Sequence, residues 1–195
     1  WKVIFDESEC CHIDWKEIRT DIPDLQDILK KYESVFEPLK HSIKEKIGVE
    51  HVIDLIDGAS PVNIPHRRLA PLEETEMDKQ LEELSKLGFI KPSTSAWGAP
   101  ILFVPKKPLP DGSYGGLRMV VDYRALNRFT KKDIYPTPNM MELVEKASGL
   151  KIYTTLDATS SYHQFPMRES DREKTAFNTP KGKYEFSVMP FGLCT

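Results

Sequence analysis

The clearest pattern of apolar positions lies in the stretch APLEETEMDKQLEELSKLGF, residues 70–89. Met77, Leu81 and Leu84 recur there at the spacing that places side chains on one face of a helix. Pro71 suits the first helical position, and Gly88 suits the position just after the last turn. The pattern therefore predicts an amphipathic helix that ends at Gly88.

Two further stretches show helical spacing. Residues 21–36 carry Leu25, Ile28, Leu29, Tyr32 and Phe36 at helical spacing, and Asp24 stands where an N-cap residue is expected. In residues 137–149, we expect Met141, Val144 and Leu143 to face inward.

Strand patterns alternate with these helices without a regular order. Residues 101–107 and 117–123 are rich in β-branched and apolar side chains, and the Pro- and Gly-rich stretch between them predicts a hairpin. Residues 174–179 and 183–189 predict a second hairpin around Pro-Lys-Gly. Residues 51–58 predict a strand or an extended arm that ends at Gly58. This mixture predicts an α+β fold.

Composition and charge narrow the class of protein. The chain has 195 residues, 39% of them hydrophobic, and no stretch apolar enough to cross a membrane. Residues 1–90 hold 12 basic and 20 acidic residues, whereas residues 91–195 hold 15 and 10, so the second part is basic. The chain has neither a signal-peptide pattern nor an initiator Met. We therefore expect it to be excised from a longer protein.

The cysteines do not form a disulfide framework. Cys10 and Cys11 are adjacent and Cys194 is remote, which favours a reducing compartment. Cys10, Cys11 and His12 lack the spaced pairs that zinc sites use. A metal site at this position is therefore not favoured.

A basic run lies within and beyond the first hairpin. Such a run could bind a polyanion, or it could be a solvated hairpin face, and composition does not choose between the two. Its members are Lys106, Lys107, Arg118, Arg124, Arg128, Lys131 and Lys132.

Asp157 follows a strand-like run, Ile152 to Leu156. A buried unpaired carboxylate is costly, so such a group is usually paired, bound to a metal or exposed at a strand end. The residues alone leave these possibilities open.

Four ordered blocks resemble one family. They read HVIDLIDGASPVNIPHRRLAP, GFIKPSTSAWGAPILFVPKK, LRMVVDYRALNRFTKKDIYPTP and YTTLDATSSYHQFPMRESDREKTAFNTPKGKYEFSVMPFGL. The chain resembles the reverse transcriptase of gypsy-type LTR retrotransposons, which are relatives of retroviral polymerases. The resemblance implies that residues 51–195 form the fingers and the start of the palm of a right-hand polymerase, incomplete at the C-terminus. Residues 1–50 would be an upstream linker, partly helical.

The resemblance implies a two-metal mechanism. Asp157 matches the first catalytic aspartate, which would bind Mg²⁺ together with the backbone carbonyl of Ala158. Two Mg²⁺ ions about 3.5–4 Å apart activate the primer hydroxyl and stabilise the leaving group in such enzymes. Mn²⁺ is an alternative ion. Without the resemblance, Asp157 reads as a strand-terminating residue bonded to nearby backbone N–H groups.

Other site residues also follow from the resemblance. Arg118 and either Lys106 or Lys107 would bind the triphosphate. Tyr162 would exclude a 2′-hydroxyl, and the alternative role for this residue is core packing. Arg124 and Asn127 match template-side or structural positions, and His163 and Gln164 match packing or supporting ones. The full set of implied nucleotide-binding residues is Lys106, Lys107, Arg118, Tyr162, Phe191 and Gly192.

The family's Asp-Asp motif lies downstream of MPFGL and does not occur in this chain. We therefore expect the isolated chain to be inactive as an RNA-directed DNA polymerase. The implied partners are an RNA or DNA template with its primer, deoxynucleoside triphosphates, and the thumb, RNase H and integrase parts of a Pol polyprotein, with no membrane. The implied location is a cytoplasmic virus-like particle, with the nucleus as an alternative.

The sequence is compatible with one other function and excludes a second. A catalytically dead relic, or a domesticated nucleic-acid-binding module, would use the same basic hairpin. An aspartic protease is excluded because no Asp-Thr-Gly or Asp-Ser-Gly triplet occurs, and LDATSS lacks the glycine.

Overall fold

The computed structural model describes residues 23–36, 48–108, 115–150, 158 and 160–194. Asp157 and the strand expected at 152–156 lie outside this part of the chain, so those expectations stay untested, as does a domain boundary at residue 50. The described helices are α1 (Pro23–Lys31), α2 (Pro71–Lys86), α3 (Arg124–Asn127) and α4 (Met140–Ala147), with 3₁₀ helices η2 (Glu33–Phe36), η4 (Ser161–Gln164) and η5 (Glu169–Thr175). The strands are β1 (Ile90–Pro92), β2 (Ala99–Pro105), β3 (Leu117–Val121), β4 (Phe177–Thr179) and β5 (Gly182–Phe186).

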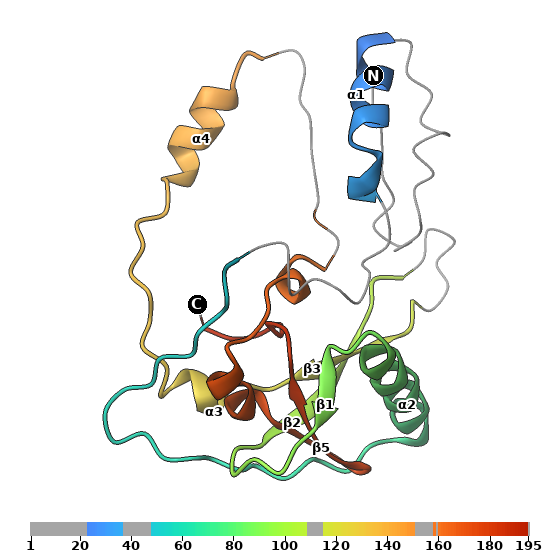
Figure 1. The fold of residues 1–195 in the computed structure, drawn as a ribbon, viewed down its shortest axis with the longest axis vertical. Coiled ribbons are helices and arrows are strands. Elements are labelled where there is room, and N and C mark those ends of the chain that lie inside the picture. Colours follow the sequence, from blue (N-terminus) through green and yellow to red (C-terminus); the bar gives the residue numbers. More distant parts are fainter. Residues whose placement is uncertain (1–22, 37–47, 109–114, 151–157, 159, 195) are drawn as a thin grey trace.

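The five strands form one sheet in the order β1-β5-β4-β2-β3 (Figure 1). Both expected hairpins are present: β2 pairs antiparallel with β3, and β4 pairs antiparallel with β5. β2 also runs parallel to β4, with Ala99 opposite Phe177, and this pairing joins the two hairpins. The predicted α+β fold is thereby confirmed.

The core lies between this sheet, α2 and the segments that follow residue 160. Ile101 and Phe177 from the sheet and Met167 before η5 are each fully buried. Met77 and Leu81 of α2 are also buried, as the helical spacing predicts. Burying side chains of this size contributes about 1.5–3 kcal/mol each, so this cluster dominates the stability of the fold.

The ends of α2 follow the expected chemistry. The N–H of Ala70 donates to the Glu73 carboxylate over 2.7 Å, which caps the first turn. At the other end Gly88 has φ +66°, and Phe89 donates from its N–H to the carbonyl of Leu84. This is the Schellman arrangement, for which glycine is the preferred residue.

The first half of the extended arm, residues 48–69, is fastened by a buried ion pair. Lys174 Nζ lies 2.6 Å from Asp171 Oδ1 and 2.8 Å from the carbonyl oxygen of Ile53. Asp171 also accepts a bond from the N–H of Ile53. The arm thereby covers Asp171 and leaves it 4% exposed, so its carboxylate is buried and is not part of a solvated turn.

The second half of the arm packs against Gly98. The N–H of Ile64 donates to the Gly98 carbonyl, and the Gly98 N–H donates to Val62. A Cβ atom on Gly98 would lie 2.0 Å from Asn63 Oδ1 and 2.5 Å from Asn178 Nδ2. Only glycine therefore lets the arm approach the start of β2.

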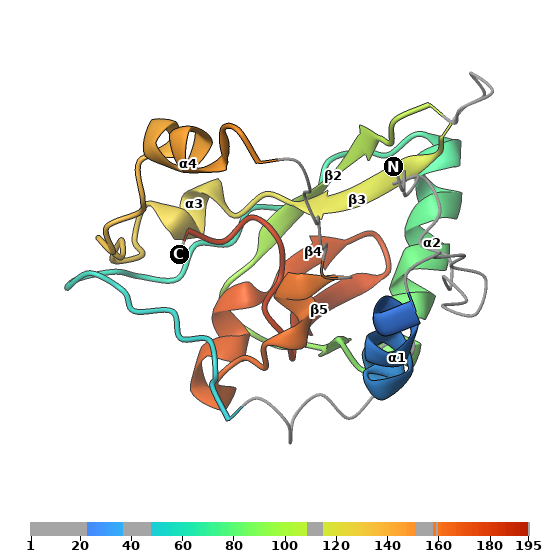
Figure 2. The same ribbon diagram turned by 90° about the horizontal axis from the view of Figure 1, so that it is seen from above.

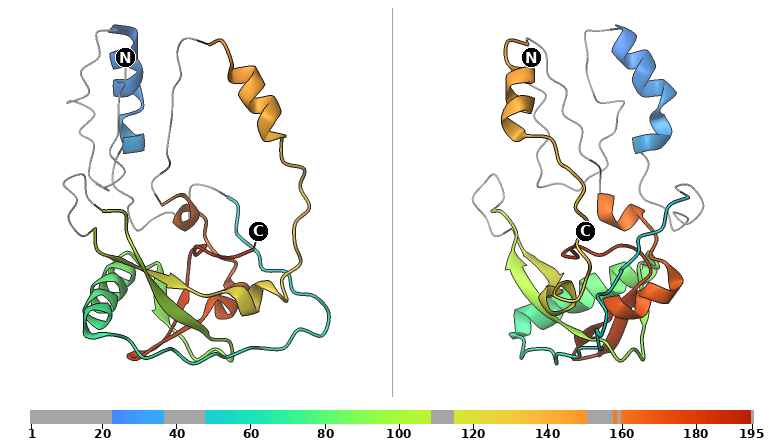
Figure 3. Two further views of the ribbon diagram at one scale, coloured as in Figure 1. Left: turned by 180° about the vertical axis from the view of Figure 1, so that it is seen from behind. Right: turned by 90° about the vertical axis from the view of Figure 1, so that its left-hand side faces the viewer.

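Helices α1 and α4 stand away from the sheet (Figures 1 and 3). In α4 the expected inward residues are exposed: Met141 by 66%, Val144 by 57% and Leu143 by 46%. That expectation is wrong, because no described residue covers the apolar face of α4. In α1 the helix already begins at Pro23, so Asp24 lies inside it and not at the N-cap position.

Within the described residues, no helix combines the length and the apolar character that crossing a membrane requires.

Candidate functional site

An exposed aromatic pair forms the centre of the candidate site. Tyr162 on η4 and Phe191 lie with ring centroids 4.9 Å apart, at an interplanar angle of 51°. Both rings remain partly open to solvent, Tyr162 by 43% and Phe191 by 46%. They are 29 positions apart in the sequence, so the fold alone brings them together.

His163 supports this pair from the core side. Its ring lies 4.9 Å from Phe191 and 5.2 Å from Phe89, and its Nδ1 is 3.1 Å from the carbonyl oxygen of Met189. Burial lowers the pKa of His163, and the bond to Met189 opposes that shift. The packing role expected for His163 agrees with these contacts.

Asn127 of α3 fastens the loop that carries Phe191. Its Nδ2 donates to the Gly192 carbonyl over 2.9 Å, and its Oδ1 accepts from the Cys194 N–H over 2.9 Å. Gly192 has φ +89°, which disfavours any other residue there. Asn127 therefore makes structural contacts, and its contact with a template stays a prediction.

The register of the β2–β3 hairpin decides which basic side chains share a face. Arg118 lies opposite Val104, and the ladder continues with the Lys106 N–H bonded to Gly116. Because opposite residues and alternate residues share a face, Lys106 and Arg118 lie on the same side of the hairpin. Lys107 belongs to the other side. Lys106, Lys107 and Arg118 are all exposed.

Gln80 of α2 pairs with the outer side of β3. Its Nε2 donates to the Leu117 carbonyl over 2.9 Å, and its Oε1 accepts from the Met119 N–H over 3.0 Å. The amide thus replaces a missing neighbouring strand on either side of Arg118. No local sequence pattern marks Gln80, because its partners are 37 and 39 positions away.

Arg124 is engaged within the chain. Its Nε and a terminal nitrogen bond Asp122 at 2.8 Å and 2.6 Å. The hydrogen bonds from Arg124 hold the pKa of Asp122 below its ordinary value, against the opposing effect of burial. The fork-to-carboxylate geometry gives Arg124 a structural partner.

The expected metal ligands are not assembled by the described residues. Asp157 lies outside them, and Ala158 is exposed. Within the described ranges no group of three or more His, Cys, Asp or Glu side chains could hold a metal ion.

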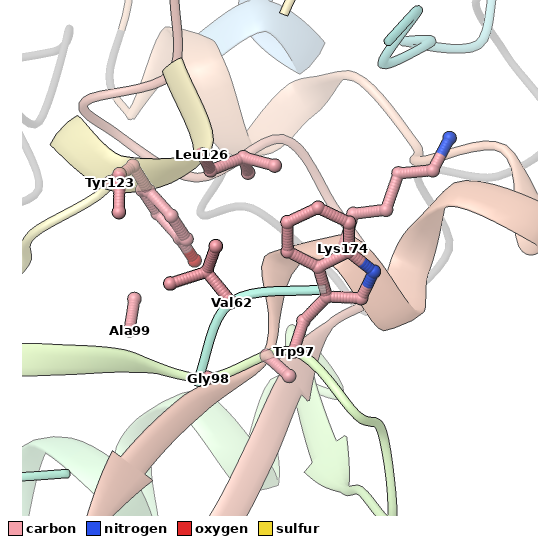
Figure 4. A pocket seen from close by; sticks show the side chains of 9 residues that line it. Val62, Trp97, Gly98, Ala99, Tyr123, Leu126 and Lys174 are labelled. Atoms are coloured by element: carbon pink, nitrogen blue, oxygen red, sulfur yellow. The ribbon is translucent and has the colours of Figure 1, made fainter. Parts of the chain in front are cut away.

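A small cavity in the core is separate from the aromatic pair. It measures about 10 Å³ and is lined by Val62, Trp97, Tyr123 and neighbouring residues (Figure 4). That is room for about one water molecule, so it is a packing defect and not a substrate pocket.

Comparison with solved structures identifies the class of fold. The Prototype Foamy Virus protease–reverse transcriptase matches with a TM-score of 0.72 over 89% of this chain and 23% of that chain, at 23% identity. The foamy viral enzyme in complex with an RNA/DNA hybrid matches with a TM-score of 0.65 over 87% of this chain and 22% of that one, at 20% identity. The fold is therefore of the reverse transcriptase type.

Sequence comparison then identifies the family. Residues 104–195 match the family described as reverse transcriptase (RNA-dependent DNA polymerase). The Pol polyprotein of transposon opus from Drosophila melanogaster is 40% identical over 177 residues, 87% of this chain and 17% of the relative. The Tf2-3 polyprotein of Schizosaccharomyces pombe is 36% identical over 178 residues, 89% of this chain and 13% of the relative.

These matches confirm the resemblance seen in the sequence blocks. Residues 104–195 match the reverse transcriptase family, and most of the chain is similar to retrotransposon Pol polyproteins, of whose length it spans less than a fifth. Because the matched relatives are Pol polyproteins, the alternative of a domesticated binding module is not favoured.

Proposed function

We propose that this chain supplies the fingers and the start of the palm of an RNA-directed DNA polymerase. The observation that carries the proposal is the meeting of Tyr162 with Phe191 as a solvent-accessible aromatic pair. These are two residues that the resemblance assigns independently to the nucleotide site. A pair of open rings backed by a buried histidine offers an apolar surface for a sugar and a base.

The triphosphate of the incoming nucleotide would bind on the hairpin. Arg118 and Lys106 share a face, so both cations can reach one polyanion, and a guanidinium fork suits phosphate oxygens. The sequence left open whether Lys106 or Lys107 contacts the triphosphate, and this shared face favours Lys106. Arg118 precedes Val121 by three residues, which is about 10 Å along β3. A Cβ atom on Gly192 would lie 3.6 Å from the Val121 carbonyl oxygen, so Gly192 lies close to the end of β3.

Tyr162 would act as the gate against ribonucleotides. Its ring lies beside Phe191 and is partly open to solvent, so a bulky side chain there would exclude an additional hydroxyl by steric contact. Phe191 and Gly192 would contact the nascent base pair. The Ser160 backbone has φ 48°, a left-handed conformation that starts η4 and sets the direction of Tyr162.

The divalent ions would bind at Asp157 and the Ala158 carbonyl. Reverse transcriptases in general use such ions to activate the primer hydroxyl and to neutralise the leaving group. Ala158 is exposed, which leaves its carbonyl accessible to a ligand. The roles assigned to the described residues concern binding and orientation of the nucleotide alone.

The template and primer would bind over the basic side chains that follow α3. The foamy viral enzyme has been solved with an RNA/DNA hybrid and with double-stranded DNA. In this chain Arg128, Lys131 and Lys132 are exposed beyond α3 and could contact phosphates. The remaining Pol segments are further proposed partners, within a particle in the cytoplasm or in the nucleus.

The proposal is tested by titrating the 195-residue chain with dTTP and following backbone amide shifts by NMR. We expect shifts at Arg118, Tyr162 and Phe191. Arg118→Ala and Lys106→Ala should weaken binding by roughly tenfold or more, because charge-assisted bonds contribute about 1.5–3 kcal/mol each. Lys107→Ala, on the other face, is the matched control and should bind like the parent chain.

A second titration compares dUTP with UTP, which differ only in the 2′-hydroxyl, and uses dUTP in place of dTTP as the deoxynucleotide. The parent chain should prefer the deoxynucleotide, and Tyr162→Val should reduce that preference. No shifts at the aromatic pair with either nucleotide, or equal losses in the Lys106 and Lys107 variants, would contradict the assignment of this site.

A further inference from the structure

Two side-chain amides, Gln80 and Asn127, hold backbone in the same manner. Gln80 bonds the Leu117 carbonyl and the Met119 N–H at 2.9 Å and 3.0 Å. Asn127 bonds the Gly192 carbonyl and the Cys194 N–H, both at 2.9 Å. In each case the two backbone groups are two residues apart, as they are for a residue that pairs with a neighbouring parallel strand.

Each held segment carries part of the proposed nucleotide site. The two groups bonded by Gln80 flank Arg118, the proposed triphosphate ligand. The two groups bonded by Asn127 flank Leu193, directly after Phe191 and Gly192. The amides therefore act on residues that they do not themselves contact through side chains.

Among the described residues, no backbone hydrogen bond supports the outer side of β3 or the segment that follows Gly192. β3 is the last strand in the described sheet order, so its outer groups face α2 and not another strand. Gln80 is itself oriented by Glu76, whose Oε1 accepts a bond from Gln80 Nε2 over 2.8 Å. An outer strand without such a partner frays more readily.

The Phe191 loop is held from both ends. Before Phe191, the Met189 N–H donates to the Phe165 carbonyl over 2.8 Å, and His163 contacts the Met189 carbonyl. After Phe191, Asn127 is the next support. Without Asn127 the loop would lose both hydrogen bonds that this amide makes, and only the packing of Leu193 against the core would hold it after Phe191, so Phe191 could move away from Tyr162.

We propose that Gln80 and Asn127 are positioning residues of the nucleotide site. Gln80 sets Arg118 for the triphosphate, and Asn127 sets Phe191 and Gly192 against Tyr162. This inference rests on the proposed function, and it replaces template contact as the role of Asn127.

The first test measures whether the amides hold the backbone, independently of any ligand. Amide hydrogen exchange in Gln80→Ala should accelerate at Met119 by about tenfold while Cys194 is unchanged, because a lost bond frees one donor. Asn127→Ala should give the reverse pattern. Asn178→Ala is the matched control, because that amide bonds Asn63 and Ile64 on the arm.

The second test measures ligand binding with dTTP and thymidine. Gln80→Ala should weaken dTTP binding by roughly three- to tenfold with little effect on thymidine, because only the triphosphate contact is disturbed. Asn127→Ala should weaken both ligands by similar factors. Gln80→Met and Asn127→Leu keep most of the side-chain volume without adding charge but lose both bonds, so the same effects are expected. These two variants are used if the alanine variants do not fold.

The two tests separate the possible failures. If the parent chain binds no triphosphate, the proposed function fails while the exchange data still judge the backbone contacts. If dTTP binds but the Gln80 and Asn127 variants bind it like Asn178→Ala, the positioning roles are overturned. Unchanged exchange at Met119 and Cys194 would overturn them at the structural level.

Discussion

Helices α2 and α4 have similar sequence patterns and opposite environments. Both carry apolar residues at helical spacing, acidic residues in the first turn and a lysine in the last. In α2, Met77 is 1% exposed and Leu81 5%, whereas in α4 Met141 is 66% exposed and Val144 57%. The difference lies in what each helix can pack against.

α2 lies against both ends of the sheet order. It contacts β1 and β3, and Gln80 bonds the backbone of β3 directly. Residues 131–150, the segment around α4, are exposed throughout except for a half-buried Ala147. In the view of Figure 2, α2 and α4 lie at opposite sides of the sheet. An amphipathic pattern thus predicts a helix with one apolar face, but the burial of that face depends on a partner surface.

The largest expected effect on the free energy of unfolding comes from removing the buried carboxylate of Asp171 on η5. Asp171→Ala leaves Lys174 buried without its partner and frees the Ile53 N–H, so the free energy of unfolding should fall by about 3–5 kcal/mol. Glu145→Ala on the exposed α4 should change it by less than about 0.5 kcal/mol. Urea unfolding followed by circular dichroism measures both, and equal small losses would mean that the arm is not held by this pair.

The direct comparison of the helices uses apolar truncations. Met77→Ala should lower the free energy of unfolding by about 2–5 kcal/mol, because it empties a buried site. Met141→Ala removes the same atoms from an exposed face and should cost less than about 0.5 kcal/mol. A large loss in Met141→Ala would show that α4 packs against something in solution.

Backbone strain offers a finer comparison of the two regions. Gly192 and Gly149 have similar positive φ values, +89° and +81°. Gly192→Ala should lower the free energy of global unfolding by about 1–2 kcal/mol, because alanine resists this conformation and the loop is tied to the core. Gly149→Ala carries the same local strain but should leave global unfolding unchanged, since its segment packs on nothing described. Equal losses in thermal unfolding would contradict this separation.

The smallest effect concerns pH. Burial lowers the pKa of His163 below its ordinary value of about 6.5, so as the pH falls the unfolded chain takes up the proton first. The free energy of unfolding should therefore be constant above about pH 6.5 and fall below it. His51 behaves in the same direction, because burial outweighs the nearby Asp171.

His163→Phe should reduce this slope, since a neutral ring occupies the same site without titrating. Among the described residues, His51 is the other histidine whose pKa is lowered, so it should contribute to the slope that remains. Residues 131–150 contain no histidine, so the segment around α4 does not contribute to this dependence. An unchanged slope between pH 7 and 5 in the variant would contradict the assignment to His163.

Local patterns were enough to predict much of the fold. The start and end of α2 follow from Pro71 and Gly88, and both hairpins follow from alternating strands around turn residues. The ordered blocks were enough to identify the reverse transcriptase family, and the match over residues 104–195 agrees with them. These features depend on residues that are close together in the sequence.

Only the tertiary structure decided which side chains meet. The Tyr162–Phe191 pair, the Asp171–Lys174 contact with Ile53 and the amide bonds of Gln80 join residues 29 to 121 positions apart. The register, and not the composition, placed Lys106 on the Arg118 face. The tertiary structure also decided that the apolar face of α2 and the carboxylate of Asp171 are buried, whereas the apolar face of α4 is exposed. Burial depends on surfaces that segments far apart in the sequence build together.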